Sequence, residues 1–432
     1  MLDRTIQPLT NSLDKIDIVQ PERRVMSNGV MLNVIQAGEQ DVVRLDLLLR
    51  GGRYQQSQPL QALFANRMLR EGSSRYTSGQ IEEKLDYYGA WLELSAGMEY
   101  SFLTLYSLNK YFPQVLEIVE SIIKEPTFPE KELRTTLDVN RQQLLVNSTK
   151  GDFISQKYFN LSVFGTAHPS GRTVTVDDYD VLNREVLKKF HRHYYHSANC
   201  SVYLSGKVTA EIESRVENAF GKQSWGEIKE REEFETFRPD SSMEKRIFVE
   251  RSDAMQSSLR MGCVTMDRNN PDYLKMRVLM TLFGGYFGSR LMSNIREDKG
   301  YTYGISSGIL FYPGTGVFVV STEADGEYTE NIVKEVYHEM EVLKNDLVTD
   351  KELSIVRNYM LGQMCRNYEG PFSLAEAWTF IETNHLDESY YQRSLEAVRE
   401  VSSSDLRELA IKYFNNDGLT EVVVGKKISN KL

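Results

Sequence analysis

Two side chains that can donate several hydrogen bonds, Arg296 and Tyr303, lie close together in the sequence. They stand on either side of Gly300 in the segment RLMSNIREDKGYTYG, residues 290–304. A tyrosine hydroxyl donates one hydrogen bond, and a permanently charged guanidinium adds several donors. Fixed donors of this kind can stabilise the oxyanion that forms when a carbonyl group is attacked. Each residue alone also has an ordinary structural use, since arginine in a last helical turn complements the helix dipole.

The elements around this pair can be predicted from the same segment. Gly300 is a natural residue for the position just after a helix end, so Arg296 falls in the last turn of a helix. Tyr303 then opens an alternating apolar segment, residues 303–324, which turns at Pro313 and Gly314 and is typical of a β-hairpin. Both side chains can therefore project from one helix–strand corner.

The chain repeats itself over half of its length. Lys-Glu-Leu triplets begin at residues 131 and 351, within PEKELRTTLDVNRQQLL and TDKELSIVRNYMLGQM. Residues 191–206, HRHYYHSANCSVYLSG, align without a gap with residues 410–425, AIKYFNNDGLTEVVVG. Matches in the same order at one offset, 219 or 220 residues, indicate a duplication.

Each half has strands, a helix, an alternating hairpin and then helices of 3.6-residue period, which predicts an α+β fold. We expect two homologous halves, each an antiparallel β-sheet packed with α-helices. A charged, aperiodic stretch, SWGEIKEREEFETFRPDSSMEK, separates them. The predicted domains are residues 1–223 and 246–432, joined by a linker over residues 224–245.

Three histidines, His191, His193 and His196, have a spacing that resembles a set of metal ligands. They fall near a predicted helix end, where the helix dipole favours cations. The corresponding segment of the second half, AIKYFNNDG, has no histidine. We therefore interpret the group as structural.

The duplicated order of elements, the segment VFGTAHPSGRT (residues 163–173) and the segment from Leu282 to Gly304 resemble the pitrilysin/insulinase-like zinc peptidases. Within that family the chain resembles the short-chain branch, whose members work as pairs of subunits. The resemblance implies a helix with an H-x-x-E-H motif, in which two histidines bind zinc and the glutamate activates the zinc-bound water. A glutamate from a later helix completes the ligand set.

None of these zinc functions is present in the aligned residues. The two histidine positions hold Leu63 and Arg67, the glutamate position holds Asn66, and the later glutamate falls at Gln142 or Gln143. Leucine has no lone pair to offer and arginine stays protonated. The sequence therefore predicts no metal and no cofactor in this chain.

The resemblance also implies roles for the arginine–tyrosine pair and for a partner. In family members such a pair reaches across a chamber to the zinc site of the opposite half or subunit. We therefore expect a non-catalytic subunit of a heterodimeric zinc metallopeptidase, with Arg296 and Tyr303 acting in trans. A homologous subunit with an intact H-x-x-E-H motif would hold the zinc, and extended peptides would be substrates. Residues 89–96, GAWLELSA, align with the edge strand on which such peptides add.

Two alternatives remain open from the sequence. One is a peptide-binding or scaffold protein of the same fold with no peptidase role, and the other is a homodimer with an unrelated activity. The formal net charge of −10 argues against nucleic acid as a partner. The sequence has no run of about 18 apolar residues, so no membrane span is expected. Three scattered cysteines and an opening segment without a signal-peptide core favour a cytoplasmic location.

Overall fold

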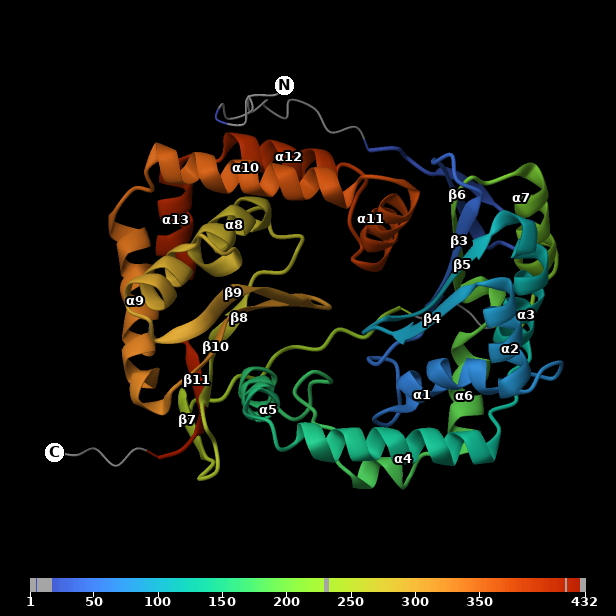
Figure 1. Cartoon of the computed structure of the whole chain (residues 1–432), viewed down its shortest axis with the longest axis horizontal. Coiled ribbons are helices and arrows are strands. Elements are labelled where there is room, and N and C mark those ends of the chain that lie inside the picture. The colour runs from blue at the N-terminus through green and yellow to red at the C-terminus, as the bar shows by residue number, and fades with distance from the viewer. Residues whose placement is uncertain (1–4, 6–17, 229–232, 416–417, 428–432) are drawn as a thin grey trace.

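Two β-sheets, each covered by helices, form the body of the molecule (Figure 1). The computed structural model describes residue 5 and residues 18–228, 233–415 and 418–427. The first sheet has the order β1 (Glu22–Val25), β2 (Met31–Gln36), β6 (Cys200–Gly206), β3 (Val42–Arg50), β5 (Tyr100–Leu108) and β4 (Trp91–Ala96). The second has the order β7 (Arg246–Glu250), β11 (Thr420–Gly425), β8 (Ser257–Thr265), β10 (Thr315–Ala324) and β9 (Thr302–Tyr312).

The strand order confirms the duplication. From β2 onward, the first sheet matches the second strand for strand: β2, β6, β3, β5 and β4 correspond to β7, β11, β8, β10 and β9. In both sheets the last strand of the half pairs in parallel with an early strand, β6 with β2 and β11 with β7, while the other neighbours are antiparallel. The two predicted hairpins, β4–β5 and β9–β10, are confirmed as antiparallel pairs. The α+β class is also confirmed.

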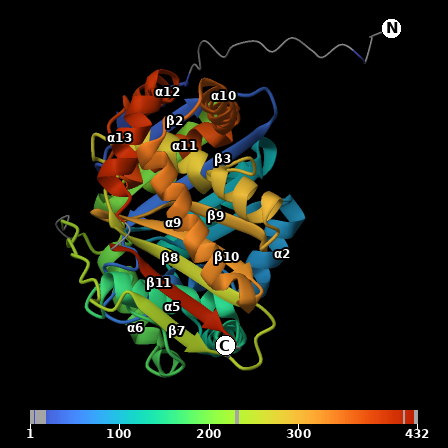
Figure 2. The ribbon, with the colours of Figure 1, turned by 90° about the vertical axis from the view of Figure 1, so that its left-hand side faces the viewer.

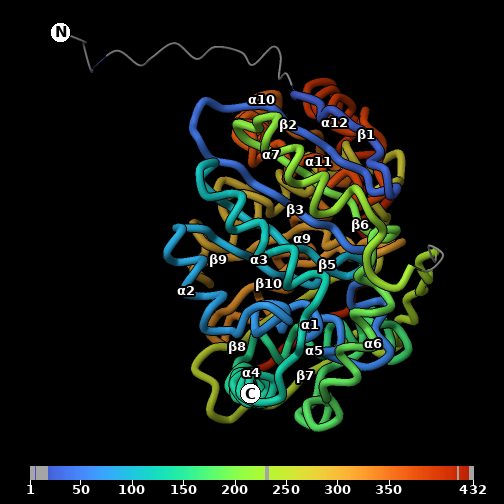
Figure 3. The backbone as a smooth tube through the Cα atoms, turned by 90° about the vertical axis from the view of Figure 1, so that its right-hand side faces the viewer, coloured from blue at the N-terminus to red at the C-terminus, as the bar shows by residue number. Residues whose placement is uncertain are grey.

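Helices cover the sheets because their apolar residues recur on one face. In α3, for example, Val115, Val119 and Ile122 are buried, at the three- and four-residue spacing of a helix. Figure 3 shows α3 on the outer side of the first sheet, and Figure 2 shows α9 in front of the second. The helices of the first half are α1 (Gln61–Arg67), η1 (Met68–Glu71), α2 (Ser78–Tyr88), α3 (Phe112–Lys124), α4 (Glu130–Asn147), α6 (Arg184–Tyr194) and α7 (Ala210–Val216). Those of the second are α8 (Tyr273–Met280), η6 (Thr281–Gly285), η7 (Met292–Asp298), α9 (Thr329–Asn345), α10 (Asp350–Asn367), α12 (Tyr390–Glu400) and α13 (Ser403–Tyr413).

Two equivalent helices are exchanged between the halves. Helix α5 (Gly151–Phe164) packs on β8 and β11 of the second sheet, and α11 (Pro371–Thr383) packs on β6 and β2 of the first (Figure 1). The α5 contact is apolar, with Phe159 and Val163 against valines of β10 and β11. The α11 contact is also apolar, with Leu374 and Trp378 in one buried cluster with Ile35 of β2, and the Tyr203 hydroxyl adds a hydrogen bond to Glu382 at 2.8 Å. The exchange fastens the two halves to each other.

The segment predicted as a linker is irregular, but the parts on its two sides do not pack as two separate bodies. Residues 224–228 and 233–245 form neither helix nor strand. Because α5 and α11 each pack on the sheet of the opposite half, the sequence halves and the packed halves differ. The domain boundaries at residues 223 and 246 stay a prediction.

Candidate functional site

Helix α1 corresponds to the zinc-binding helix of the zinc peptidases, and its side chains are engaged in contacts within the protein. Asn66 is buried and its side-chain amide donates to the carbonyl of Phe102 at 3.2 Å and to the Tyr195 hydroxyl at 3.1 Å. Burial raises the pKa of Tyr195 to about 12, so this hydroxyl stays protonated at neutral pH. Leu63 packs against the hydrophobic core of the first half. Leu63 has no lone pair, and the neutral amide of Asn66 already donates two hydrogen bonds within the protein. Neither residue can serve as a zinc ligand or a general base.

Arg67 meets α4 at Asn140, whose side-chain oxygen accepts a hydrogen bond from the guanidinium. Asn140 lies on the inward face of α4, since Leu137 and Leu133 are buried about one and two turns before it. Gln142 and Gln143, where the sequence alignment placed the distal glutamate, are both exposed. The α4 residue that meets Arg67 is Asn140, which was not singled out, and the placement of the distal glutamate at Gln142 or Gln143 stays a prediction.

The residues at the expected zinc position are Leu63, Arg67, Asn66 and Asn140. They offer an aliphatic side chain, a cation and two neutral amides. This donor set does not fit zinc, which takes thiolate, imidazole and carboxylate ligands. Within the described ranges, no group of three or more His, Cys, Asp or Glu side chains could hold a metal ion.

The histidines are part of the packing around the end of α6. His191 is buried beside Phe128, and its Nε2 lies 2.8 Å from the carbonyl oxygen of Ile123. Burial lowers the pKa of His191 to about 4, so the ring is neutral at pH 7. These contacts support the structural interpretation of the group.

The second predicted site, the corner between η7 and β9, is open. Tyr303 is 92% exposed, while Arg296 packs over the ring of Phe287 with its guanidinium carbon 4.5 Å from the ring centroid. The Nε of Arg296 donates to the backbone carbonyl of Tyr303 at 3.0 Å. Gly300 has φ of +66°, as expected for the residue after a helix end. The structure thus brings the two predicted residues together and leaves the tyrosine in solvent.

Two irregularities shape this corner, and the sequence analysis predicted neither. Helix η7 is a π-helix, the same form as η6 and the segment Glu217–Gly221. In β9, Thr302 pairs with Ala324 but Ile305 pairs with Thr322, so three steps on β9 face two on β10. Tyr303 lies in the resulting β-bulge, and bulges re-aim side chains. The buried hydroxyl of Thr302 donates to the carbonyl of Glu323 at 2.7 Å and holds the bulge.

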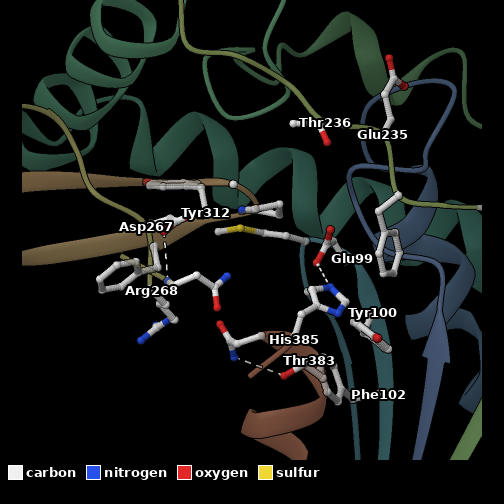
Figure 4. Close-up of a pocket in the computed structure, with 18 residues that line it drawn as sticks. Glu99, Tyr100, Phe102, Glu235, Thr236, Asp267, Arg268, Tyr312, Thr383 and His385 are labelled. Atoms are coloured by element: carbon white, nitrogen blue, oxygen red, sulfur yellow. Dashed lines mark hydrogen bonds and ion pairs between the residues drawn. The ribbon is translucent and has the colours of Figure 1, made fainter. Parts of the chain in front are cut away.

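A cavity of about 410 Å³ lies between the halves, and it is separate from this corner. Figure 4 shows Glu99 of the first half facing His385 of the second, 3.1 Å apart, with Tyr100 and Phe102 beside them. The tip of the β9–β10 hairpin lines the cavity, but Arg296 and Tyr303 do not. The predicted role of the pair at a partner's zinc site is not tested by this cavity and stays a prediction. Tyr303 lies at the opposite end of β9 from Tyr312, roughly 30 Å away at the usual rise per residue.

The predicted edge strand, β4, ends the first sheet. Its residues pair with β5, and its exposed and covered residues alternate from Trp91, which is 67% exposed. Such an edge presents free backbone donors and acceptors to an added strand.

Comparison with protein families places the chain. Residues 39–162 match the family model described as "Insulinase (Peptidase family M16)", and residues 182–360 match "Peptidase M16 inactive domain". The chain belongs to peptidase family M16. Among curated proteins, an uncharacterized zinc protease of Rickettsia bellii is 22% identical over 94% of this chain and 97% of its own length. The "Non-peptidase homolog YmxG" of Helicobacter pylori is 22% identical over 86% of this chain and 85% of its own length.

Solved structures have the same fold as this chain. A structure described as a peptidase M16 inactive domain from Pseudomonas fluorescens superposes with a TM-score of 0.84 at 23% identity, covering 96% of this chain and 100% of its own. A protease from Helicobacter pylori superposes with a TM-score of 0.83 at 17% identity, covering 94% of this chain and 99% of its own. The M16 membership and the unsuitable donor set together fit a chain without zinc chemistry of its own.

Proposed function

We propose that this M16 chain is the non-catalytic subunit of a heterodimeric zinc metallopeptidase and lends Arg296 and Tyr303 to the partner's active site. The observation that carries the proposal is the exposed tyrosine on a β-bulge, anchored through its own carbonyl to Arg296. A tyrosine placed for packing would bury its ring, whereas a donor for a ligand must keep its hydroxyl unspent.

The two residues would divide the work at the partner's zinc centre. The Tyr303 hydroxyl would donate to the oxyanion of the attacked peptide carbonyl. Arg296 uses its Nε on the Tyr303 carbonyl, and its Nη1 lies 3.9 Å from the exposed Glu297 carboxylate, which leaves Nη2 to add charge and hydrogen bonds. Zinc and the general base would come from a homologous subunit with an intact H-x-x-E-H motif.

Extended peptides are the proposed substrates. The outer edge of β4 can pair with a peptide through backbone hydrogen bonds alone, so it suits substrates of varied sequence. No helix in the described part of the chain is long and apolar enough to cross a membrane. The three cysteines are free thiols, which supports the predicted cytoplasmic location; that location stays a prediction.

A scaffold role without peptidase activity is the second candidate. It is favoured by the name of the Helicobacter pylori relative, a non-peptidase homolog, and by the position of Tyr303 outside the cavity between the halves. The two candidates differ in what they require of a partner, since only the first requires a zinc-bearing subunit that becomes active on mixing.

Titration of this chain into a purified H-x-x-E-H homolog from the same organism tests the proposal. We expect hydrolysis of a fluorogenic peptide to rise and saturate at one chain per partner, with zinc found by elemental analysis in the partner only. If the partner is equally active alone, or if this chain alone shows chelator-sensitive hydrolysis, the proposal is wrong.

A further inference from the structure

A second cavity, of about 380 Å³, carries two arginines and no carboxylate. It lies between loops of the first half, helix α5 and Tyr312 of the second half, and its lining includes Arg53 and Arg172. No Asp or Glu is among its lining residues, although acidic residues outnumber basic ones in the whole chain. The other lining residues are Tyr54, Gln56, Pro59, Met98, Gln156, Asn160, Pro169, Ser170 and Val174.

Neither arginine is neutralised within the part of the chain that the structure describes. Arg53 donates from Nε to the carbonyl of Gly97 at 3.4 Å, and no carboxylate forms an ion pair with it or with Arg172. Both residues are exposed. Two permanent positive charges at one cavity attract anions to it.

Three uncharged side chains at the cavity, Gln56, Gln156 and Asn160, carry amide donors. The Oε1 of Gln56 accepts from the backbone N–H of Ala62 at 3.3 Å, so its amide nitrogen is directed elsewhere. Gln156 and Asn160 stand one turn apart on α5 and line the same cavity. Amide and guanidinium N–H groups together suit oxygens that carry negative charge.

We propose that this cavity binds a small dianion through carboxylate or phosphate oxygens, with Arg53 and Arg172 as its charged ligands. This site is independent of the proposed role at a partner's zinc centre. The loops that carry Arg53 and Arg172 belong to the first half, whereas α5 packs on the second sheet and Tyr312 ends β9. A bound dianion would therefore contact groups that are fixed to both sheets and would stabilise their arrangement.

Calorimetric titration of the full chain at low ionic strength tests this site with three probes: inorganic phosphate, pyrophosphate and succinate. We expect saturable binding of one anion per chain. Tighter binding of the phosphates would assign a phosphoryl ligand, and tighter binding of succinate a dicarboxylate. Because a charge-assisted hydrogen bond is lost, Arg172→Gln and Arg53→Gln should each weaken binding about tenfold to a hundredfold.

The matched control is Arg134→Gln, which removes the same charge from an exposed position on α4, away from the cavity lining. Binding should be unchanged in this variant. Equal weakening in Arg134→Gln would show non-specific attraction, and absence of saturable binding with all three probes would show that no dianion site exists. Either result overturns the proposal.

Discussion

The two halves contain the same helix–strand corner, and they build it differently. In the first half α2 ends at Gly89, with φ of +61°, and leads into β4; in the second, η7 ends before Gly300, with φ of +66°, and leads into β9. Helix α2 is a regular α-helix that begins with a capping box, and β4 pairs with β5 without a register shift. At the second corner the helix is a π-helix and the strand is bulged.

This difference shows what the fold requires and what it does not. The first corner reaches the same position in the sheet with ordinary geometry, so neither the π-helix nor the bulge is needed to build the half. Both irregularities occur where Arg296 and Tyr303 meet, and the exposed Tyr303 lies in the bulge. Irregular backbone that packing does not require is typical of functional sites.

The largest expected effect is that of Tyr303→Phe on peptide hydrolysis by the assembled complex. The change removes one hydroxyl from an exposed ring, so assembly and peptide affinity should be kept. Turnover should fall by about tenfold to a thousandfold, as for other oxyanion donors. The control is Tyr87→Phe on α2, which removes the hydroxyl of another exposed tyrosine at the first corner. Equal turnover in the two variants would remove the functional distinction between the corners.

A smaller loss is expected for Arg296→Lys. Lysine keeps the charge but loses the planar fork that bonds the Tyr303 carbonyl and presents further donors, so turnover should fall by about tenfold. Measured kcat and KM should show the loss mainly in kcat. A change confined to KM would indicate a role in binding the peptide.

The bulge itself can be weakened by Thr302→Val. Valine has a similar shape but cannot donate to the Glu323 carbonyl, so the free energy of unfolding should fall by about 1 kcal/mol in chemical denaturation. Turnover of the complex should also decrease, because Tyr303 lies next to the weakened contact. Full turnover in a destabilised variant would separate the bulge from function.

The stability of the first half should depend on pH through a buried histidine that has no part in the proposed function. Burial lowers the pKa of His191 to about 4, below its ordinary value, so the unfolded chain binds a proton first on acidification. The contribution of His191 to the free energy of unfolding is therefore fully present above about pH 6.5. It is lost as the pH falls toward 4, by about 1 kcal/mol at pH 5.5. His191→Gln should reduce the slope of unfolding free energy against pH between 6.5 and 4. An unchanged slope would contradict a buried neutral ring.

The fold and the positions of Arg296 and Tyr303 at one helix–strand corner could be predicted from the sequence, because both depend on local patterns. Hydrophobic alternation predicted the hairpins, and Gly300 predicted the helix end between Arg296 and Tyr303. The bulge at Tyr303 depends on the register between two strands, which alternation within one strand does not report. Asn140 was missed because it becomes the neighbour of Arg67 only when α4 docks on α1. The dianion cavity was missed because Arg53, Arg172 and Gln156 come from separate segments.

The affinity of a peptide phosphonate, whose anionic oxygens mimic the oxyanion, tests the central claim most directly. Because a transition-state mimic gains from groups that act in the transition state, its Kd for the zinc-containing complex should depend on the Tyr303 hydroxyl. We predict that Tyr303→Phe weakens phosphonate binding by the same factor by which it lowers kcat/KM, while substrate affinity stays unchanged. An unaltered phosphonate Kd in the assembled Tyr303→Phe complex would contradict the claim that this chain contributes to the chemistry.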